Sequence, residues 1–269
     1  MTPQSSIVET PFGKYMVWPN DHALISRLEK NKLTKTEPII ELSKKIIEAS
    51  SNKVILDIGA NIGTYSIPQA IDFPNVSFYC FEVQRLVFYQ LCGNISLNGL
   101  DNMFPFNFAV SNKTGTMEIP VIHDYSVIRN VGGYVIDPFS LSYLKGDFSS
   151  DRYTVKMNSL DSMNELPAAG LIKIDVEGHE LEVLQGAVSY INKSSFPPIF
   201  FEAWEYDWYK GKKDQLFRFL ISLGYKNITS PFKDNNFLAQ NKDSTNVFLT
   251  FETNSETGFM KIERHIRNV

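Results

Sequence analysis

The chain has 269 residues, of which 43% are hydrophobic and 13% aromatic, enough to build the core of one elaborated domain. Its formal net charge of −4 argues against a protein that binds nucleic acid mainly through phosphate contacts. The two cysteines, Cys80 and Cys92, give neither metal-ligand spacing nor a disulfide framework. No apolar run is long enough to span a bilayer, and residues 1–9 lack the features of a secretory signal, so we expect a soluble, cytoplasmic protein.

The N-terminal part of the chain differs in pattern from the rest. A short extended stretch at residues 15–18 and a helix at residues 38–49 precede the first strand of a repeating region. We therefore expect residues 1–50 to form an N-terminal extension packed on a core domain of residues 51–269.

From residue 54 onward, short β-branched or aromatic runs alternate with longer helical patterns, which is typical of a mostly parallel sheet covered by helices on both faces. Strands are predicted at residues 54–57, 77–82, 103–110, 171–176, 199–203, 225–229 and 247–251. Helices are predicted between them at residues 64–72, 86–97, 180–191 and 213–223. The interval 120–151 fits neither pattern and is predicted to be a lid-like insertion.

The turn after the first predicted strand carries the first chemical signal. Asp57 ends the strand, and Gly59 and Gly63 follow where the backbone must approach a ligand closely. The next helix points free N–H groups at the same place, which suits the polar parts of a nucleotide-like cofactor. Glu82 ends the second strand, where a carboxylate can accept hydrogen bonds from both hydroxyls of a ribose.

The glycine pattern of this turn distinguishes between nucleotide classes. A dinucleotide site requires glycine at two later positions, which Asn61 and Thr64 occupy here. A phosphate-binding loop would need a glycine-lysine-serine or glycine-lysine-threonine ending, which the sequence lacks. The turn therefore favours a cofactor without phosphates.

Five segments in order resemble the motifs of the FkbM-type methyltransferases: VILDIGANIGTYS, FEVQ, NISLNGLDN, NFAVSNKTGT and LIKIDVEGHELEVLQGA, within residues 54–203. The resemblance implies a doubly wound, mostly parallel, seven-stranded Rossmann-like methyltransferase sheet whose last strand is antiparallel. It also implies S-adenosyl-L-methionine as the cofactor and transfer of its methyl group to oxygen, often on sugars or natural products. The family often has a proline after the acidic residue of the second strand, where this chain has Val83 and Gln84.

Carried over by position, the resemblance implies cofactor contacts from Asp57, Gly59, Asn61 and Gly63 at the amino-acid end, Glu82 at the ribose, and Asn107 and Ala109 beside the adenine.

Two acidic segments follow the ends of neighbouring predicted strands and supply candidates for catalysis. Asp175, His179 and Glu202 are candidates for the base that removes a hydroxyl proton, with His179 slightly favoured for its intrinsic pKa. Glu177 is either a site residue or, like Glu180, a residue that favours the helix N-terminus. Asp175, Glu177 and Glu202 could also hold a divalent metal, but their spacing matches no dedicated ligand motif, so metal-free catalysis is preferred.

The acceptor of the methyl group is expected to bind between the insertion and residues 204–213. Flat aromatic side chains suit the C–H face of a sugar ring, although packing explains any single one equally well; the candidates are Trp204, Tyr206, Trp208, Tyr209, Tyr125 and Tyr134. We therefore expect a saccharide or glycoconjugate acceptor.

Four alternatives remain open at the level of the sequence: ribose 2′-O-methylation of RNA, O-methylation of a small natural product, a dehydrogenase, and a non-catalytic binding module.

Overall fold

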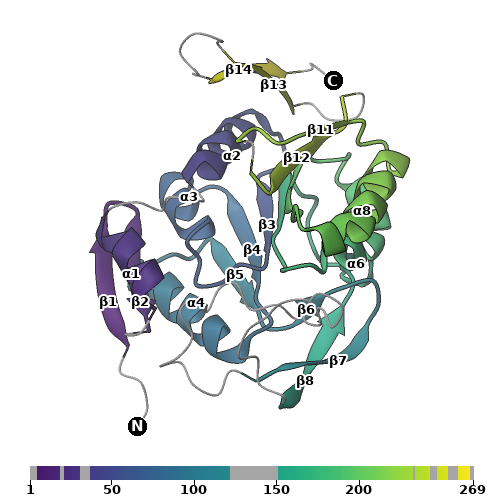
Figure 1. Ribbon diagram of the computed structural model, residues 1–269. Helices are drawn as coiled ribbons and strands as arrows, with labels where there is room; N and C mark the ends of the chain where they lie inside the picture. The colour runs from purple at the N-terminus through teal and green to yellow at the C-terminus, as the bar shows by residue number, and fades with distance from the viewer. Residues whose placement is uncertain are drawn as a thin grey trace.

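The computed structural model describes residues 5–18, 21–30, 37–121, 151–232, 234–242, 247–253 and 260–266. A central sheet runs through the molecule between two layers of helices, as Figure 1 shows. The predicted lid lies outside the described residues except at its two ends, and so do Tyr125 and Tyr134. Within the described ranges, no helix is long and apolar enough to cross a membrane.

The central sheet has seven described strands in the order β11-β12-β10-β9-β3-β4-β5. Their bounds are β3 Val54–Ile58, β4 Ser77–Phe81, β5 Met103–Phe106, β9 Leu171–Ile174, β10 Ile199–Glu202, β11 Asn227–Thr229 and β12 Asn236–Gln240. Strands β10, β9, β3, β4 and β5 are parallel, whereas β12 is antiparallel to both of its neighbours. The chain order reverses between β3 and β9, and ligands bind at such a switch point beyond the carboxyl ends of the strands.

The predicted fold class is confirmed, but the seventh strand was placed in the wrong segment. Residues 247–251 belong to β13 (Val247–Thr253), which pairs with β14 (Met260–Ile266) in a separate two-stranded sheet. The sheet strand is β12, whose short NFLAQ sequence has a polar residue at each end and gives a weaker strand pattern than VFLTF. Gln240 of β12 is fully buried and exchanges two hydrogen bonds with the backbone of Leu249, which ties β13 to the sheet.

Two predicted elements are each divided in the structure. The strand at 103–110 ends with β5, and β6 (Ala109–Val110) joins a second sheet with β8 (Arg152–Asn158) and β7 (Gly115–Pro120). The helix at 180–191 divides into α6 (Glu180–Gln185) and α7 (Val188–Lys193). At the break, a Cβ on Gly186 would lie 2.0 Å from the carbonyl oxygen of Ser111, so glycine is required for this close approach.

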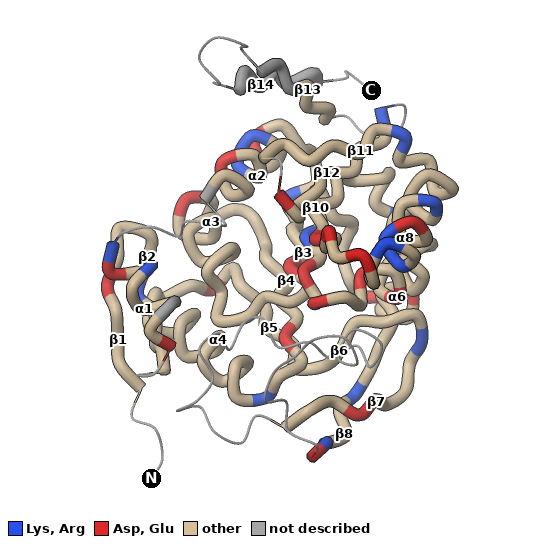
Figure 2. The backbone as a smooth tube through the Cα atoms, in the orientation of Figure 1, with Lys and Arg blue, Asp and Glu red and all other residues tan. Residues whose placement is uncertain are grey.

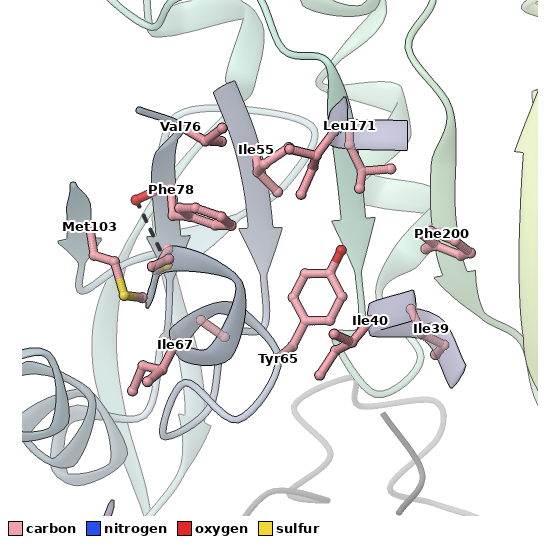
Figure 3. Packing of buried hydrophobic residues seen from close by; sticks show 14 of the residues in the cluster. Ile39, Ile40, Ile55, Tyr65, Ile67, Val76, Phe78, Met103, Leu171 and Phe200 are labelled. Carbon is pink, nitrogen blue, oxygen red and sulfur yellow. Dashed lines mark hydrogen bonds between the residues drawn. The ribbon is translucent and has the colours of Figure 1, made fainter. Parts of the chain in front are cut away.

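The alternation of side chains along the strands separates the core into two halves. Helices α2 (Glu37–Ala49), α3 (Ser66–Asp72) and α4 (Arg85–Leu97) cover one face, where Ile55 and Phe78 point. Figure 3 shows this half with Tyr65 at its centre. Helices α6, α7 and α8 (Lys210–Ser222) cover the opposite face, where Leu56 and Phe201 point. This arrangement fixes the strand ends that carry the site.

The N-terminal segment forms a hairpin of β1 (Ser6–Thr10) and β2 (Gly13–Val17), followed by α1 (His22–Glu29). Tyr15 and Val17 are fully buried in the same half of the core as α4. Asn94 of α4 accepts a hydrogen bond from the backbone N–H of Met16 at 2.5 Å, and Asn98 accepts one from Lys14 at 2.8 Å. The hairpin thus packs directly on the helix that follows β4.

Candidate active site

The turn after β3 is held tightly by the backbone around it. The N–H groups of Gly59 and Ala60 both donate to the carbonyl of Phe81 at 2.9 Å, which joins the ends of β3 and β4. Gly59 has a φ of +83°, and a Cβ there would lie 1.8 Å from the carbonyl oxygen of Asp175. Asn61 also has a positive φ, of 52°, and its side chain accepts from the N–H of Ile62 at 2.8 Å. The positive φ angles of the turn therefore favour glycine at position 59 and asparagine at position 61.

Glu82 presents an oriented carboxyl group beside this turn. One of its oxygens accepts from the N–H of Asn61 at 2.9 Å and the other from the N–H of Gln84 at 2.8 Å. Each carboxylate oxygen keeps a second lone pair for a further donor. Burial raises the pKa of Glu82 to about 7, although both amide hydrogen bonds act in the opposite direction.

A pocket with about 660 Å³ of empty space, part of it open to solvent, lies between the turn and Glu82. Among the described residues, it is lined by Ile58, Gly59, Asn61, Phe81, Glu82, Val83, Gln84, Val87, Phe108, Ala109, Val110, Asp175, Val176 and Glu177. A carboxyl group that can accept two hydroxyl hydrogen bonds lies beside apolar walls that suit a flat base. The pocket therefore fits the nucleoside part of S-adenosylmethionine.

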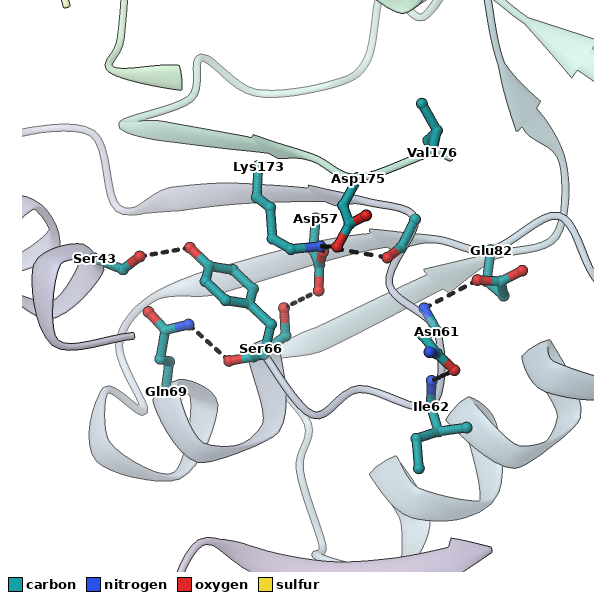
Figure 4. A network of polar contacts seen from close by, with 12 residues as sticks. Ser43, Asp57, Asn61, Ile62, Ser66, Gln69, Glu82, Lys173, Asp175 and Val176 are labelled. Atoms are coloured by element: carbon teal, nitrogen blue, oxygen red, sulfur yellow. Dashed lines mark hydrogen bonds and ion pairs between the residues drawn. The ribbon is translucent and has the colours of Figure 1, made fainter. Parts of the chain in front are cut away.

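Three of the residues predicted to contact the cofactor are not among the residues that line this pocket: Asp57, Gly63 and Asn107. Asp57 is the clearest case. Its carboxylate is fully buried, accepts from the hydroxyl of Ser66 at 2.6 Å and pairs with Lys173 Nζ at 3.1 Å. Figure 4 shows Lys173 reaching from β9 toward both Asp57 and Asp175. Asp57 therefore supports the turn through buried contacts, and its direct contact with the cofactor stays a prediction.

Gly63 and Asn107 also act from behind the pocket. Gly63 has a φ of +92°, and a Cβ there would lie 2.7 Å from Ile67 Cδ1, so it permits close packing of the turn on α3. Asn107 donates from Nδ2 to the backbone carbonyls of Glu82 at 2.7 Å and Val83 at 3.1 Å. It thereby fixes the strand end that carries Glu82.

Lys173 was missed in the sequence as a site residue, although a lysine inside the apolar strand LIKI is a visible signal. Its side chain is buried, with Nζ 3.1 Å from Asp57, 3.4 Å from Asp175 and 5.3 Å from the centre of the Tyr65 ring. The two carboxylates raise the pKa of Lys173 despite the opposing effect of burial. This ammonium therefore joins the cofactor turn to the end of β9.

The predicted acidic residues after β9 and at the end of β10 do converge, as a cluster of Asp175, Glu177 and Glu202. One carboxylate oxygen from each lies within 4.8 Å of the others, and Asp175 and Glu177 line the pocket. Burial, followed by repulsion from Asp175, raises the pKa of Glu202 to about 8 and that of Glu177 well above its usual range. Figure 2 shows acidic segments gathered beside β3 and β10, next to the basic stretch that opens α8.

His179, the slightly favoured base, does not line the pocket as described. The residue is 8% exposed, with Nε2 2.9 Å from the hydroxyl of Ser111 and Nδ1 3.6 Å from Glu182. The ring therefore faces Ser111, which directly follows β6. His179 is thus placed by its contact with Ser111, and its role as a base stays a prediction.

Glu180 is buried and has a larger part than the helix-dipole contact expected for it. Its Oε1 accepts from the N–H groups of Val176 and Gly178, each at 3.2 Å, and its Oε2 accepts from the hydroxyl of Tyr209 at 3.3 Å. Burial raises the pKa of Glu180 to about 7. The buried carboxyl group of Glu180 thus holds the backbone of the loop between β9 and α6.

Aromatic residues extend the site beyond β10. The rings of Tyr206 and Trp208 stack with centroids 5.4 Å apart and planes at 11°, and Trp204 meets both at its edges. Tyr206 is 51% exposed, whereas Trp204 is 7% exposed. We call Trp204, Tyr206 and Trp208 the aromatic platform; it begins two residues after Glu202.

Comparison with known proteins identifies the family. Residues 57–226 match the Methyltransferase FkbM domain. The hexuronic acid methyltransferase AglP of Haloferax volcanii is 27% identical over 149 residues, which cover 55% of this chain and 56% of that protein. The methyltransferase sdnD of Sordaria araneosa is 26% identical over 183 residues, covering 60% of this chain and 70% of that one.

Among solved structures, the precorrin-6y C5,15-methyltransferase of Geobacter metallireducens is similar with a TM-score of 0.44 and 14% identity, covering 87% of this chain and 85% of that one. The family match covers more than half of the chain and includes the turn, Glu82 and the acidic cluster up to Glu202. The chain therefore belongs to the FkbM methyltransferase family and is an S-adenosylmethionine-dependent methyltransferase.

Proposed function

We propose that the protein transfers a methyl group to a hydroxyl of a saccharide or glycoconjugate. The observation that carries this proposal is the acidic cluster, of which Asp175 and Glu177 line the pocket, together with the aromatic platform that follows Glu202 in the chain. The relationship to a hexuronic acid methyltransferase supports the same acceptor class. A saccharide offers hydroxyl groups for the carboxylates and a C–H face for the aromatic rings.

Four of the predicted residues are proposed to hold the cofactor directly. Glu82 accepts hydrogen bonds from the two ribose hydroxyls, and Ala109, in the apolar wall with Phe108, lies against the adenine. Gly59 and Asn61 form the floor under the amino-acid end. Asp57, Gly63 and Asn107 support these residues from behind.

When bound, S-adenosylmethionine supplies a methyl group on a positively charged sulfur. Methyl transfer forms the O–C bond as the S–C bond breaks, and the hydroxyl proton must pass to a base. Glu202 and Asp175 are the proposed acceptors of that proton, with Glu202 preferred because its pKa of about 8 suits a base near neutral pH. His179 has no part in this proposal, because its ring faces Ser111.

Catalysis without a metal ion is part of the proposal. The three clustered carboxyl groups are hard oxygen ligands that could hold a divalent ion. The ammonium of Lys173 lies 3.4 Å from Asp175, however, and disfavours a second cation there. Activity is therefore expected to survive exhaustive chelation; its loss, followed by recovery with Mg²⁺, would establish a metal site.

The acceptor class is tested by incubating the full chain with methyl-labelled cofactor and four groups of acceptors: uronic and neutral saccharides, nucleotide sugars, RNA, and hydroxylated natural products. We expect label in a saccharide or nucleotide sugar, and its loss when Glu202 is changed to glutamine. Glu205→Gln is the matched control, because this carboxyl is exposed and pairs with Lys213. Label found only in RNA or only in a natural product would overturn the saccharide proposal.

A further inference from the structure

The loop between β9 and α6 holds one of the clustered carboxyl groups in a backbone conformation that few residues adopt. Glu177 has a φ of +53°, followed by Gly178 at +99°. A non-glycine residue in this region is strained and persists only where surrounding contacts impose it. Those contacts come from Glu180, whose Oε1 accepts the N–H groups on both sides of Glu177.

Glu180 is in turn held from the segment that contains the aromatic platform. Its Oε2 accepts the hydroxyl of Tyr209 at 3.3 Å, and both side chains are about 1% exposed. The ring of Tyr209 lies 5.2 Å from that of Trp204 and 5.7 Å from that of Trp208, centre to centre. The ring of Tyr209 therefore packs against the aromatic platform, which is the proposed acceptor surface. Its hydroxyl donates to Glu180, which in turn holds the loop of the acidic cluster.

We propose that Glu180 and Tyr209 are positioning residues that connect the aromatic platform to the carboxyl group of Glu177. The inference rests on the proposed function for its acceptor, but its structural part does not. A saccharide that settles on the stacked rings of Tyr206 and Trp208 fixes Trp208, which packs against the ring of Tyr209. The Tyr209 hydroxyl fixes Glu180, and Glu180 fixes the loop from Val176 to Gly178, so the acidic cluster is aligned when the acceptor is in place.

The pair is suited to this task because its hydrogen bonds lie out of contact with bulk water. A hydrogen bond to a carboxyl group in the interior is stronger than one at the surface, and removal of its donor leaves an acceptor without its partner. Neither residue lines the cofactor pocket as described. Their loss should therefore affect the chemical step more than cofactor binding.

The test is Tyr209→Phe, which removes the hydroxyl but keeps the ring that packs on the platform. We expect kcat to fall about tenfold, as for loss of a hydrogen bond to a buried carboxyl, with the acceptor KM and the cofactor Kd within about twofold of wild type. Glu180→Gln keeps an oxygen for the two loop amides and an amide group for the Tyr209 hydroxyl. It should therefore retain more activity than Glu180→Ala.

Tyr225→Phe is the matched control, because this tyrosine is also fully buried and its hydroxyl donates to the carbonyl of Pro197 at 2.8 Å, away from the pocket lining. It should lower stability to a similar extent and leave kcat unchanged. An equal fall in kcat for Tyr225→Phe and Tyr209→Phe would overturn the positioning role.

Hydrogen exchange of the loop amides separates this inference from the proposed function. In the cofactor-bound protein, Tyr209→Phe should speed exchange at Val176 and Gly178, whereas Tyr225→Phe should not. Unchanged exchange in Tyr209→Phe would overturn the inference whatever the acceptor is. Faster exchange in a protein that methylates no saccharide would instead contradict the proposed function alone.

Discussion

The cofactor turn and the acidic cluster lie at neighbouring strand ends but differ in how their carboxyl groups are stabilised. In the turn, Asp57 is satisfied by Ser66 and Lys173, and Glu82 by two backbone amides. In the cluster, three carboxyl groups crowd within 4.8 Å, and burial raises the pKa of two of them. The polar groups of the first region are paired before a ligand arrives, whereas the carboxyl groups of the second repel one another.

The largest expected effect is the loss of stability in Gly59→Ala, which places a side chain in the cofactor turn. Its Cβ would lie 1.8 Å from the carbonyl oxygen of Asp175 in a residue with a φ of +83°. Strain and overpacking together should lower the free energy of unfolding by about 4 kcal/mol, measured by urea denaturation. Gly99→Ala is the control, because Gly99 has a φ of +62° but nothing within 4 Å of an added Cβ. Equal losses for both variants would show that the close approach is unimportant.

Lys173→Met tests the link between the two regions. It leaves the buried carboxylate of Asp57 without its cation, and loss of one partner of a buried ion pair costs about 3 kcal/mol or more. The double variant Asp57→Asn with Lys173→Met removes both charges and should recover part of this stability. A double variant as unstable as the sum of the two single ones would contradict the pairing.

Features of the site that depend on contiguous residues could be predicted from the sequence, whereas those that depend on contacts between distant residues could not. The turn and Glu82 were predictable, because a few contiguous residues determine positive φ angles and the end of a strand. The roles of Lys173 and Tyr209 were not, because each contacts residues far away in the sequence.

The position of His179 was also not predictable from its sequence neighbours. It is close in sequence to the acidic cluster, but its ring contacts Ser111, which is far away in the sequence. In the fold, β12 escaped prediction because its pattern is short and its burial comes from neighbours on both sides.

Glu202→Gln tests the acidic region by chemistry. Removal of the proposed base should reduce kcat by about 100-fold, in the range that general base catalysis contributes, without a comparable change in cofactor affinity. Steady-state kinetics with the identified acceptor measures both quantities. A variant with wild-type kcat would exclude Glu202 as the base and leave Asp175.

The pH dependence of stability sharpens the comparison further. Burial raises the pKa of Glu82 to about 7 and that of Glu202 to about 8, above the value of about 4.3 of an unfolded glutamate. Between these values the folded protein holds protons that the unfolded chain has released, so stability is lost as the pH rises. The slope should approach about 1.4 kcal/mol per pH unit for each proton held.

Urea denaturation of the cofactor-free protein between about pH 5 and pH 8 measures this slope, and Glu82→Gln and Glu202→Gln should each reduce it. A free energy of unfolding that rises across this range would contradict the protonation described for both regions.

The most direct test of the account is calorimetric titration of S-adenosylmethionine into the wild-type protein, Glu82→Gln and Glu202→Gln. We predict binding to the wild type, a loss of about 10- to 100-fold for Glu82→Gln because the amide has one acceptor oxygen for the ribose where the carboxyl group has two, and little change for Glu202→Gln. Wild-type affinity in Glu82→Gln would contradict the claim that this carboxyl group organises the cofactor site.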